Sequence, residues 1–408
     1  MKAETLKAAI NVFDPEKPLQ TQEELDHFFI ERSDSPLSEL AILLETATVS
    51  PPKILFTGHR GSGKSTELAK LCTMLADQFF IVTFSVKDII NLFDITYVDV
   101  ILAMATELFR TASESKLKIR KKLYEDIYSW FKSEVEIEKV VDEKAEANIG
   151  AALNLYVMKL QSKIGAETST RTLVREKVEP RLSELLERIN LMINEIESGS
   201  GKHVLIMVED LDKTDLVKAK EIFCGHTMTL TEPECAVLYT FPTALRHDND
   251  FIGMCQSFDE IHVLPNFKIS HADGTKDDDG YKQLQQIVLN RVEADLFDAE
   301  AIDFMLKLCG GLPRELVRLA RRACLLAIAR NKQSVDLDIM QQAGNRLRND
   351  YRILLTSDQL DILKTVKETK RVENTADYRA LLHNLSILEF RNGDVWHDVN
   401  PILHELLD

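Results

Sequence analysis

One short segment combines glycines, a lysine and a hydroxyl at the spacing that phosphate binding uses. Residues 53–66 read KILFTGHRGSGKST, in which Gly58, Gly63, Lys64 and Ser65 form the pattern G-x4-G-K-S. Glycines let the backbone curl so that successive N–H groups point at phosphate oxygens. The lysine adds a full positive charge for the β- and γ-phosphates, and the serine hydroxyl suits Mg²⁺. The segment therefore predicts a binding loop for the phosphates of ATP with Mg²⁺.

The surroundings of this loop support the same prediction. Residues 53–57 form a short apolar run typical of a buried strand, and residues 65–76 carry leucines at helical spacing. A strand before the loop and a helix after it are the setting in which this glycine pattern binds nucleotides. The start of the helix adds partial positive charge beside the phosphates. We expect these residues to contact the nucleotide: Gly58, His59, Arg60, Gly61, Ser62, Gly63, Lys64, Ser65 and Thr66.

A second apolar run ends in carboxylates. Residues 204–212 read VLIMVEDLD, so that Glu209, Asp210 and Asp212 follow a buried strand. One acid at such a strand tip can hold Mg²⁺ through water, and a second can orient the attacking water. By position, Glu209 would lie on the metal side and Asp210 on the water side. By chemistry, Asp210 could hold the metal instead, and Asp212 is a weaker third candidate.

Two further polar residues are candidates for contact with the nucleotide. Thr240 ends the apolar run CAVLYTF, beside the acidic strand, where it can contact the γ-phosphate or the lytic water; Thr243 is the alternate. Arg314 lies in GGLPREL, in which two glycines end one helix and Pro313 begins the next. A cation near a helix N-terminus is mildly unfavourable, which suggests an anionic partner such as ATP phosphate. The alternatives are an ordinary strand end and a solvated arginine.

The composition limits the class of partner. The 408 residues carry a formal net charge of −16 at pH 7. Phosphate surfaces repel such a chain, which argues against a general nucleic-acid or membrane binder but leaves room for a local basic patch. The six cysteines include no CxxC pair, so the cysteine pattern signals neither a zinc site nor a disulfide framework. We expect a cytoplasmic protein without a signal peptide or membrane span. The absence of an NKxD run favours ATP over GTP.

The elements that must position these residues predict an α/β fold with a parallel sheet. Residues 79–86 predict a second strand, yet the next convincing strand begins only near residue 204. A simple crossover needs far fewer residues, so we interpret 112–198 as a helical insertion. A flexible Ser-Gly-Ser-Gly joint at 198–201 is expected to lead into the acidic strand. Residues 1–50 predict a helical lead-in to this core.

The part of the chain after the core is mostly helical. Residues 51–270 contain all the predicted strands of the core, and 280–350 have helical spacing throughout. Residues 354–408 form a smaller mixed segment, in which two helices precede the strands LEF and DVWHDV. An Asn-Gly pair between those strands is a hairpin signal.

Taken together, these motifs resemble the AAA+ and STAND branch of P-loop ATPases. The likeness rests on GHRGSGKST, on VEDLD after a strand, on the strand ending in Thr240, and on GGLPREL, and is closest to bacterial ATPases akin to the origin-recognition and KAP groups. It implies a helical lid at 280–350 and a winged-helix-like domain at 354–408. It also implies that Thr240 serves as sensor 1 and Arg314 as sensor 2.

The resemblance implies an ATP-dependent molecular switch that acts in bacterial phage defence or in regulation through protein partners, commonly as a homo-oligomer. Most relatives have Asp first in the acidic pair, whereas here Glu209 precedes Asp210, so we expect slow or partner-stimulated hydrolysis. Arg246 and Arg291 are candidates for an arginine acting in trans. The alternative function is an origin-recognition-like ATPase that binds DNA through residues 354–408.

Overall fold

The computed structural model describes most of the chain. The middle of the segment interpreted as an insertion, residues 135–161, lies outside the described part, as does Gly393 of the hairpin signal. The described residues are 2–47, 50–115, 117–134, 162, 165, 168–392 and 394–407.

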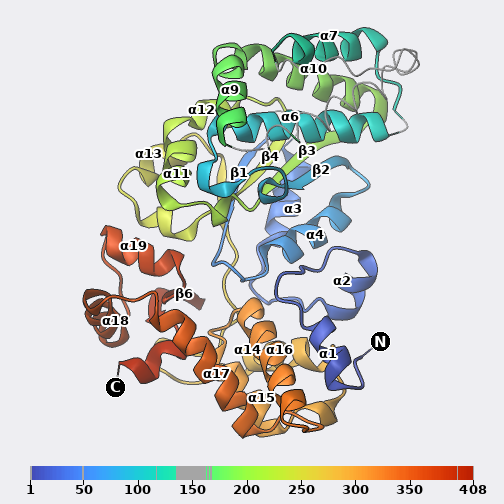
Figure 1. Ribbon diagram of the computed structural model, residues 1–408. Coiled ribbons are helices and arrows are strands. Elements are labelled where there is room, and N and C mark those ends of the chain that lie inside the picture. Colours follow the sequence, from blue (N-terminus) through green and yellow to red (C-terminus); the bar gives the residue numbers. More distant parts are fainter. Residues whose placement is uncertain are drawn as a thin grey trace.

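A five-stranded parallel sheet forms the centre of the molecule (Figure 1). Its strands are β1 (Lys53–Thr57), β2 (Phe79–Ser85), β3 (His203–Glu209), β4 (Ala236–Phe241) and β5 (Glu260–Val263). They lie in the order β2-β3-β4-β1-β5, which places β4 between the glycine-loop strand and the acidic strand. Every residue of β1 and β4 is buried, as expected for central strands covered on both faces. The fold is the α/β core of P-loop nucleoside triphosphatases, as the sequence predicts.

Helices cover both faces of this sheet. Because successive side chains of a strand point to opposite faces, Ile54 and Phe56 of β1 join one hydrophobic cluster and Leu55 joins another. The first cluster includes α3 (Leu37–Thr46) and α4 (Lys64–Leu75). The second is larger and includes α6 (Tyr97–Glu114), α7 (Lys121–Glu134), α9 (Thr168–Val178) and α10 (Leu182–Ser200), which form the upper layer of Figure 1.

The predicted flexible joint at residues 198–201 is wrong. Helix α10 continues through Ser200, and Gly201 caps it in a left-handed conformation with φ of 69°. The N–H of Gly201 donates to the Glu197 carbonyl at 2.9 Å. The last turn is held because Ile193 and Ile196 are fully buried on the sheet side, and tertiary packing of this kind outweighs the low helix propensity of glycine.

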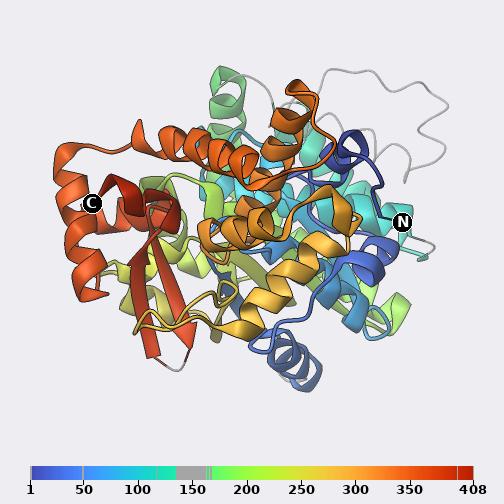
Figure 2. The same cartoon turned by 90° about the horizontal axis from the view of Figure 1, so that it is seen from below.

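The lower half of the molecule contains the helices that follow the sheet (Figure 1). These are α14 (Asp278–Leu289), α15 (Ala299–Leu308), α16 (Pro313–Ala329) and α17 (Leu337–Arg352). We call residues 357–407 the C-terminal unit; it comprises α18 (Ser357–Thr369), α19 (Ala376–His383), β6 (Ile387–Asn392) and β7 (Asp394–Val399), with a final 3-10 turn at Pro401–Leu406. The two strands pair antiparallel, which confirms the predicted hairpin and is clear from below in Figure 2.

The first 50 residues are divided between the two halves. Helix α1 (Leu6–Val12) packs on α16, in the hydrophobic cluster that also contains α14–α17 and the C-terminal unit. Helix α3 instead packs against the sheet. Shorter helices complete the described chain: α2 (Gln22–Phe28), α5 (Val86–Ile89), α11 (Leu216–Lys220), α12 (Thr227–Thr231) and α13 (Phe251–Cys255). Among the described helices, none has the length and apolar character that crossing a membrane requires.

Candidate nucleotide-binding site

A cavity of about 930 Å³ lies where the carboxyl ends of the central strands meet the lower half of the molecule. Carboxyl ends of parallel strands are where open α/β sheets bind ligands. The glycine loop, the acidic strand end, residues 11–32 and the first turn of α16 all contribute to its wall. The predicted site residues that line it are Gly61, Gly63, Lys64, Ser65, Thr66, Glu209, Asp210, Thr240 and Arg314.

Lys64 lies in this cavity with its ammonium group surrounded by oxygens. Its Nζ donates to the carbonyls of Gly58 at 2.7 Å and His59 at 3.0 Å, and forms an ion pair with Asp212 at 2.9 Å. Burial lowers the pKa of Lys64, while the charge of Asp212 opposes that change. Phosphate oxygens entering the cavity would compete with Asp212 for the ammonium.

Glu209 lies beside the loop serine. The hydroxyl of Thr83 on β2 donates to its carboxylate at 3.3 Å, and Ser65 lies close enough to favour its charged form. Burial raises the pKa of Glu209 to about 7. Carboxylate and hydroxyl oxygens are suitable ligands for Mg²⁺. The position of Glu209 close to Ser65 in the same cavity therefore favours Glu209 as the acid on the metal side.

The other two acids face different partners. Asp210 has a left-handed backbone with φ of 69°, and its carboxylate accepts a hydrogen bond from Ser85 at 2.7 Å and pairs with Lys87 at 3.5 Å and with Lys213. Asp212 instead pairs with Lys64. Sequence reasoning ranked Asp212 third, but the short 3-10 turn after the strand brings it to Lys64.

The two candidate threonines hold the backbone of the site. Thr240 Oγ1 accepts a hydrogen bond from the N–H of Leu211 at 3.1 Å, in the turn between the acids. Thr243 Oγ1 accepts from the N–H of Gly58 at 3.1 Å, where the glycine loop begins. Both hydroxyls thus position segments that carry the charged groups, and Thr240 also lines the cavity.

The first turn of α16 rests on the glycine loop. The N–H of Arg314 donates to the Gly61 carbonyl at 3.2 Å, and its side chain Nε donates to the Pro15 carbonyl at 3.1 Å. Gly61 has φ of 83°, and a Cβ there would lie 2.8 Å from the Cβ of Arg314. Helix α16 can therefore approach the loop this closely only because residue 61 lacks a side chain.

Gly61→Ala is expected to destabilise the fold by about 1–3 kcal/mol more than Gly274→Ala. Both glycines have φ of 83°, but a Cβ at Gly274 would meet nothing within 4 Å. The backbone strain is thus matched, and only the clash with Arg314 differs. Urea unfolding of the two variants measures the difference, and equal losses of stability would contradict a close contact between α16 and the loop.

Sequence reasoning missed a buried arginine, Arg32, that braces the glycine loop and also lines the cavity. Arg32 donates to the carbonyls of Ser62 and Pro265, pairs with Glu67 at 3.2 Å, and lies 4.1 Å from the ring centre of Phe267. Its carbonyl partners are 30 and 233 residues away along the chain, so no local spacing could have marked it.

The two arginines proposed to act in trans contact their own chain. Arg291 lines the cavity, donates to the Ile287 carbonyl at 2.8 Å and lies 4.9 Å from the ring centre of Phe28. Burial lowers its pKa to about 10, so it stays charged at neutral pH. Arg246 donates to the carboxylate of Glu389 in the C-terminal unit at 2.9 Å. Within the described chain, both therefore serve intramolecular contacts.

The cavity also has an apolar portion that the sequence did not reveal. Its lining includes the side chains of Phe28, Ile30, Ile287 and Val317, which come from the N-terminal segment, α14 and α16. Apolar walls combined with a few well-placed charged groups are typical of small-molecule sites. Such a wall suits a planar nucleobase, while the loop and the acids suit phosphates with a cation.

The raised pKa of Glu209 predicts a pH dependence. At pH values between 4.5, the ordinary pKa of a glutamate, and about 7, Glu209 keeps its proton in the folded chain and has lost it in the unfolded chain. This group therefore contributes stability below pH about 4.5 that is lost as the pH rises to about 7.

A metal that binds Glu209 must displace the same proton. The Mg²⁺-dependent affinity for ATP is therefore expected to increase from pH about 6 to about 8. In Glu209→Gln, the affinity for ATP should change little over the same pH range. Calorimetric titration with ATP at each pH measures both affinities.

Comparisons with known proteins give a limited answer. No family model matches this chain, and no curated protein matches it. Similar solved structures include the Walker-type ATPase PABY2304 of Pyrococcus abyssi, with 16% identity over 97% of this chain and 99% of that one, and a TM-score of 0.48. Cdc6p of Pyrobaculum aerophilum has 11% identity, 97% and 95% coverage, and a TM-score of 0.41. The ORC2 protein of Aeropyrum pernix has 10% identity, 96% and 93% coverage, and a TM-score of 0.42. At such identities and TM-scores, none of these proteins decides what this chain does.

Proposed function

We propose that this chain is an ATP-binding and ATP-hydrolysing switch of the AAA+/STAND type. The observation that supports it most is that Lys64, Ser65, Glu209 and Arg314 line one cavity although they come from three distant segments. Lys64 and the loop N–H groups would bind the phosphates. Ser65 and Glu209 would hold Mg²⁺, which supplies charge neutralisation when bound.

Hydrolysis requires an attacking water and a way to remove its proton. As the water oxygen bonds to the γ-phosphorus, the bond to the ADP oxygen breaks and a proton leaves the water. Once phosphate oxygens take over the ammonium of Lys64, the Asp212 carboxylate is released next to the γ-phosphate position. It is then placed to orient the water and accept its proton. Arg314 would bring positive charge from the lid to the same phosphate.

A direct contact supports the switch part of the proposal. The backbone N–H of Glu389 in β6 donates to Nε2 of His59 in the glycine loop at 2.7 Å. Burial lowers the pKa of His59 to about 3, so its ring is neutral and Nε2 can accept. A change in the loop on nucleotide binding would therefore act on the C-terminal unit through one hydrogen bond. Protein partners that contact this unit would sense it.

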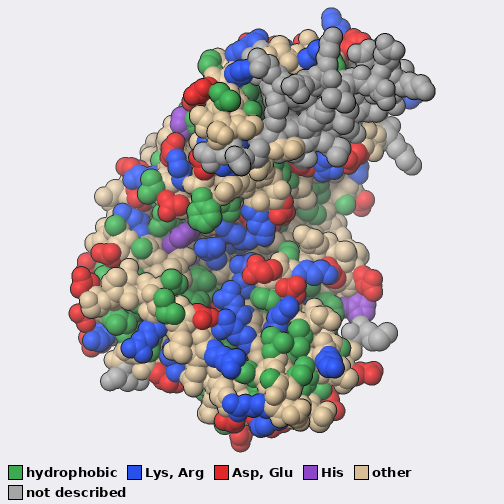
Figure 3. All heavy atoms as spheres, in the orientation of Figure 1, with side chains coloured by type: hydrophobic (Ala, Val, Ile, Leu, Met, Phe, Trp, Pro, Cys, Tyr) green, Lys and Arg blue, Asp and Glu red, His purple; other side chains and the backbone are tan. Residues whose placement is uncertain are grey.

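DNA binding is the second candidate function. Figure 3 shows Lys and Arg gathered in a band down the middle of one face of an otherwise acidic protein. In the C-terminal unit, helix α18 and the two residues after it carry four further basic side chains: Lys364, Lys367, Lys370 and Arg371. Against this candidate, helix α19 of the C-terminal unit packs on the turn at 243–247, and its Arg379 donates to the His247 carbonyl at 3.3 Å. The switch therefore stays the first proposal.

One purified preparation can test both candidates. We expect release of labelled phosphate from ATP that requires Mg²⁺, together with a change in protease sensitivity or particle size when ATP is added. A shift in size would also indicate a homo-oligomer. A chain that neither binds ATP nor changes in these assays would refute the switch. Retardation of duplex DNA in a gel at low salt would support the second candidate. If the DNA is not retarded, either with ATP or without it, DNA binding is excluded.

A further inference from the structure

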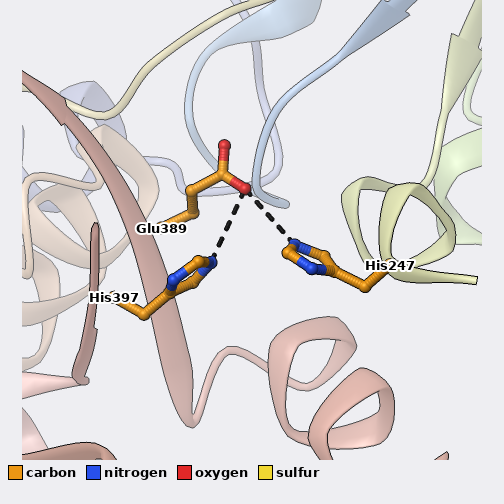
Figure 4. Close-up of side chains that lie close together, drawn as sticks. All are labelled: His247, Glu389 and His397. Atoms are coloured by element: carbon orange, nitrogen blue, oxygen red, sulfur yellow. Dashed lines mark ion pairs between the residues drawn. The ribbon is translucent and has the colours of Figure 1, made fainter. Parts of the chain in front are cut away.

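Three side chains that commonly bind metals converge outside the nucleotide cavity. His247 follows β4 in the turn at 243–247, Glu389 lies on β6 and His397 on β7, and all three point toward one another in Figure 4. One ligand atom of each lies within 4.8 Å of the other two. Glu389 and His397 are only 4% and 6% exposed. The cluster therefore joins the sheet half of the molecule to the C-terminal hairpin.

The separations in this cluster do not fit hydrogen bonds. Nε2 of His247 lies 3.5 Å and Nε2 of His397 lies 3.7 Å from the carboxylate oxygen Oε2 of Glu389. An N–H···O hydrogen bond normally spans about 2.7–3.2 Å. Both Nε2 atoms are buried without a hydrogen-bond partner, which is rare in folded proteins. Two imidazole nitrogens and one carboxylate oxygen thus face a common point that a single cation would satisfy.

The same separations suit a tetrahedral metal ion. Zinc lies about 2.0–2.2 Å from histidine nitrogen and carboxylate oxygen, which puts neighbouring ligand atoms about 3.4 Å apart. The two separations between histidine nitrogen and carboxylate oxygen, 3.5 and 3.7 Å, are close to that value, and all three ligand atoms lie within 4.8 Å of one another. Two histidines with one glutamate are also a donor set that zinc accepts, with one position left for water. Mg²⁺ and Ca²⁺ prefer all-oxygen ligands and fit this set less well.

Two arginines also hold the carboxylate of Glu389, and Arg246 reaches the oxygen that faces the histidines. Arg391 Nε donates to Oε1 of Glu389 at 2.9 Å, and Arg246 Nη1 lies 2.9 and 3.1 Å from its two oxygens. Guanidinium donors favour the charged carboxylate, which is the form that binds a metal. The guanidinium charges oppose a further cation, so we expect moderate affinity.

We propose that His247, Glu389 and His397 form a zinc site that ties the C-terminal hairpin to the segment after β4. The N–H of Glu389 donates to the glycine-loop residue His59, so the ion would fix the hairpin beside that loop. The site stands independently of ATP hydrolysis. The cysteines give no hint of it, because its ligands are two histidines and a glutamate brought together by the fold.

Metal titration of the full chain tests this proposal. After treatment with chelator and its removal, the protein is expected to bind one Zn²⁺ per chain with a Kd below about 10 µM. Co²⁺ is expected to give the visible absorption of a tetrahedral site. His397→Ala and Glu389→Gln should each weaken zinc binding at least about 100-fold. Loss of a residue that only hydrogen-bonds to a metal ligand already lowers metal affinity about 10–100-fold, and these two residues would bind the ion directly. Circular dichroism shows whether each variant folds.

The controls separate this site from other histidines and from the nucleotide cavity. His27→Ala removes an exposed histidine of α2 and should leave zinc affinity unchanged. Ser65→Ala should also leave it unchanged, which places the ion outside the nucleotide cavity. If wild-type protein binds no Zn²⁺ more tightly than about 10 µM, or if folded His247→Ala, Glu389→Gln and His397→Ala variants all retain wild-type affinity, the proposal is overturned.

Discussion

Lys64→Ala is expected to lower ATP turnover by at least about 10²–10³-fold, because it removes a positive charge aimed at the developing phosphate charge. The side chain lies in the cavity, and its ammonium is held by the carbonyls of Gly58 and His59 and by Asp212. Steady-state phosphate release at saturating ATP measures the loss. Wild-type turnover in a clean Lys64→Ala preparation would refute the assignment of this loop.

The Lys64–Asp212 ion pair complicates this variant and suggests its control. Removing the lysine leaves a buried carboxylate unpaired, which is expected to cost about 3–5 kcal/mol of folding stability. The double variant Lys64→Ala/Asp212→Asn should recover most of that stability without recovering turnover. Lys70→Ala is a matched control, since Lys70 lies on the same helix α4 outside the cavity. Its turnover and stability should stay near wild type.

Substitution of the acids is expected to separate metal binding from water activation. Glu209 lies close to Ser65 in the cavity, so Glu209→Gln should remove the Mg²⁺-dependent part of ATP affinity and keep the Mg²⁺-independent part. Asp212 contacts Lys64, so Asp212→Asn should keep Mg²⁺-dependent binding and lower turnover about 10²–10⁴-fold, the range for a lost general base. Equilibrium binding with and without Mg²⁺, followed by single-turnover hydrolysis, measures both effects.

Asp210→Asn decides between the arrangement in the structure and the order expected from the sequence. Asp210 is engaged by Ser85, Lys87 and Lys213, so we expect only a modest effect on binding and turnover. If Asp210→Asn traps bound ATP while Asp212→Asn turns over normally, Asp210 is the acid that serves the water. If Asp210→Asn loses the Mg²⁺-dependent affinity instead, it is the metal ligand and the assignment of Glu209 fails.

Much of the local structure around the candidate nucleotide site was predictable because its signals are local. The glycine loop at 58–65, the apolar run before Glu209 and the Gly-Gly-Leu-Pro-Arg turn at Arg314 each have a spacing that only a few backbone shapes satisfy. The same holds for the hairpin at 387–399, whose turn chemistry and strand pattern agree. These segments determine their own conformation, so sequence reasoning placed them well.

The order of the strands was decided by tertiary structure. Because β4 lies between β1 and β3, the hydroxyl of Thr243 reaches Gly58 and that of Thr240 reaches Leu211. The same packing brings Asp212 to Lys64 and Arg32 to Ser62. None of these pairs has a fixed spacing along the chain, so no motif can encode it.

By itself, the sequence determined that this protein has a glycine loop between a strand and a helix, and a later strand that ends in acids, because backbone geometry over ten or so residues is set by glycine, proline and apolar spacing. It did not determine which acid meets the lysine, or that His247 would face Glu389 and His397. Those contacts depend on burial of three hydrophobic clusters that fold distant segments against one another. Only that packing brings their charges within ion-pair distance, where desolvation makes each contact energetically significant.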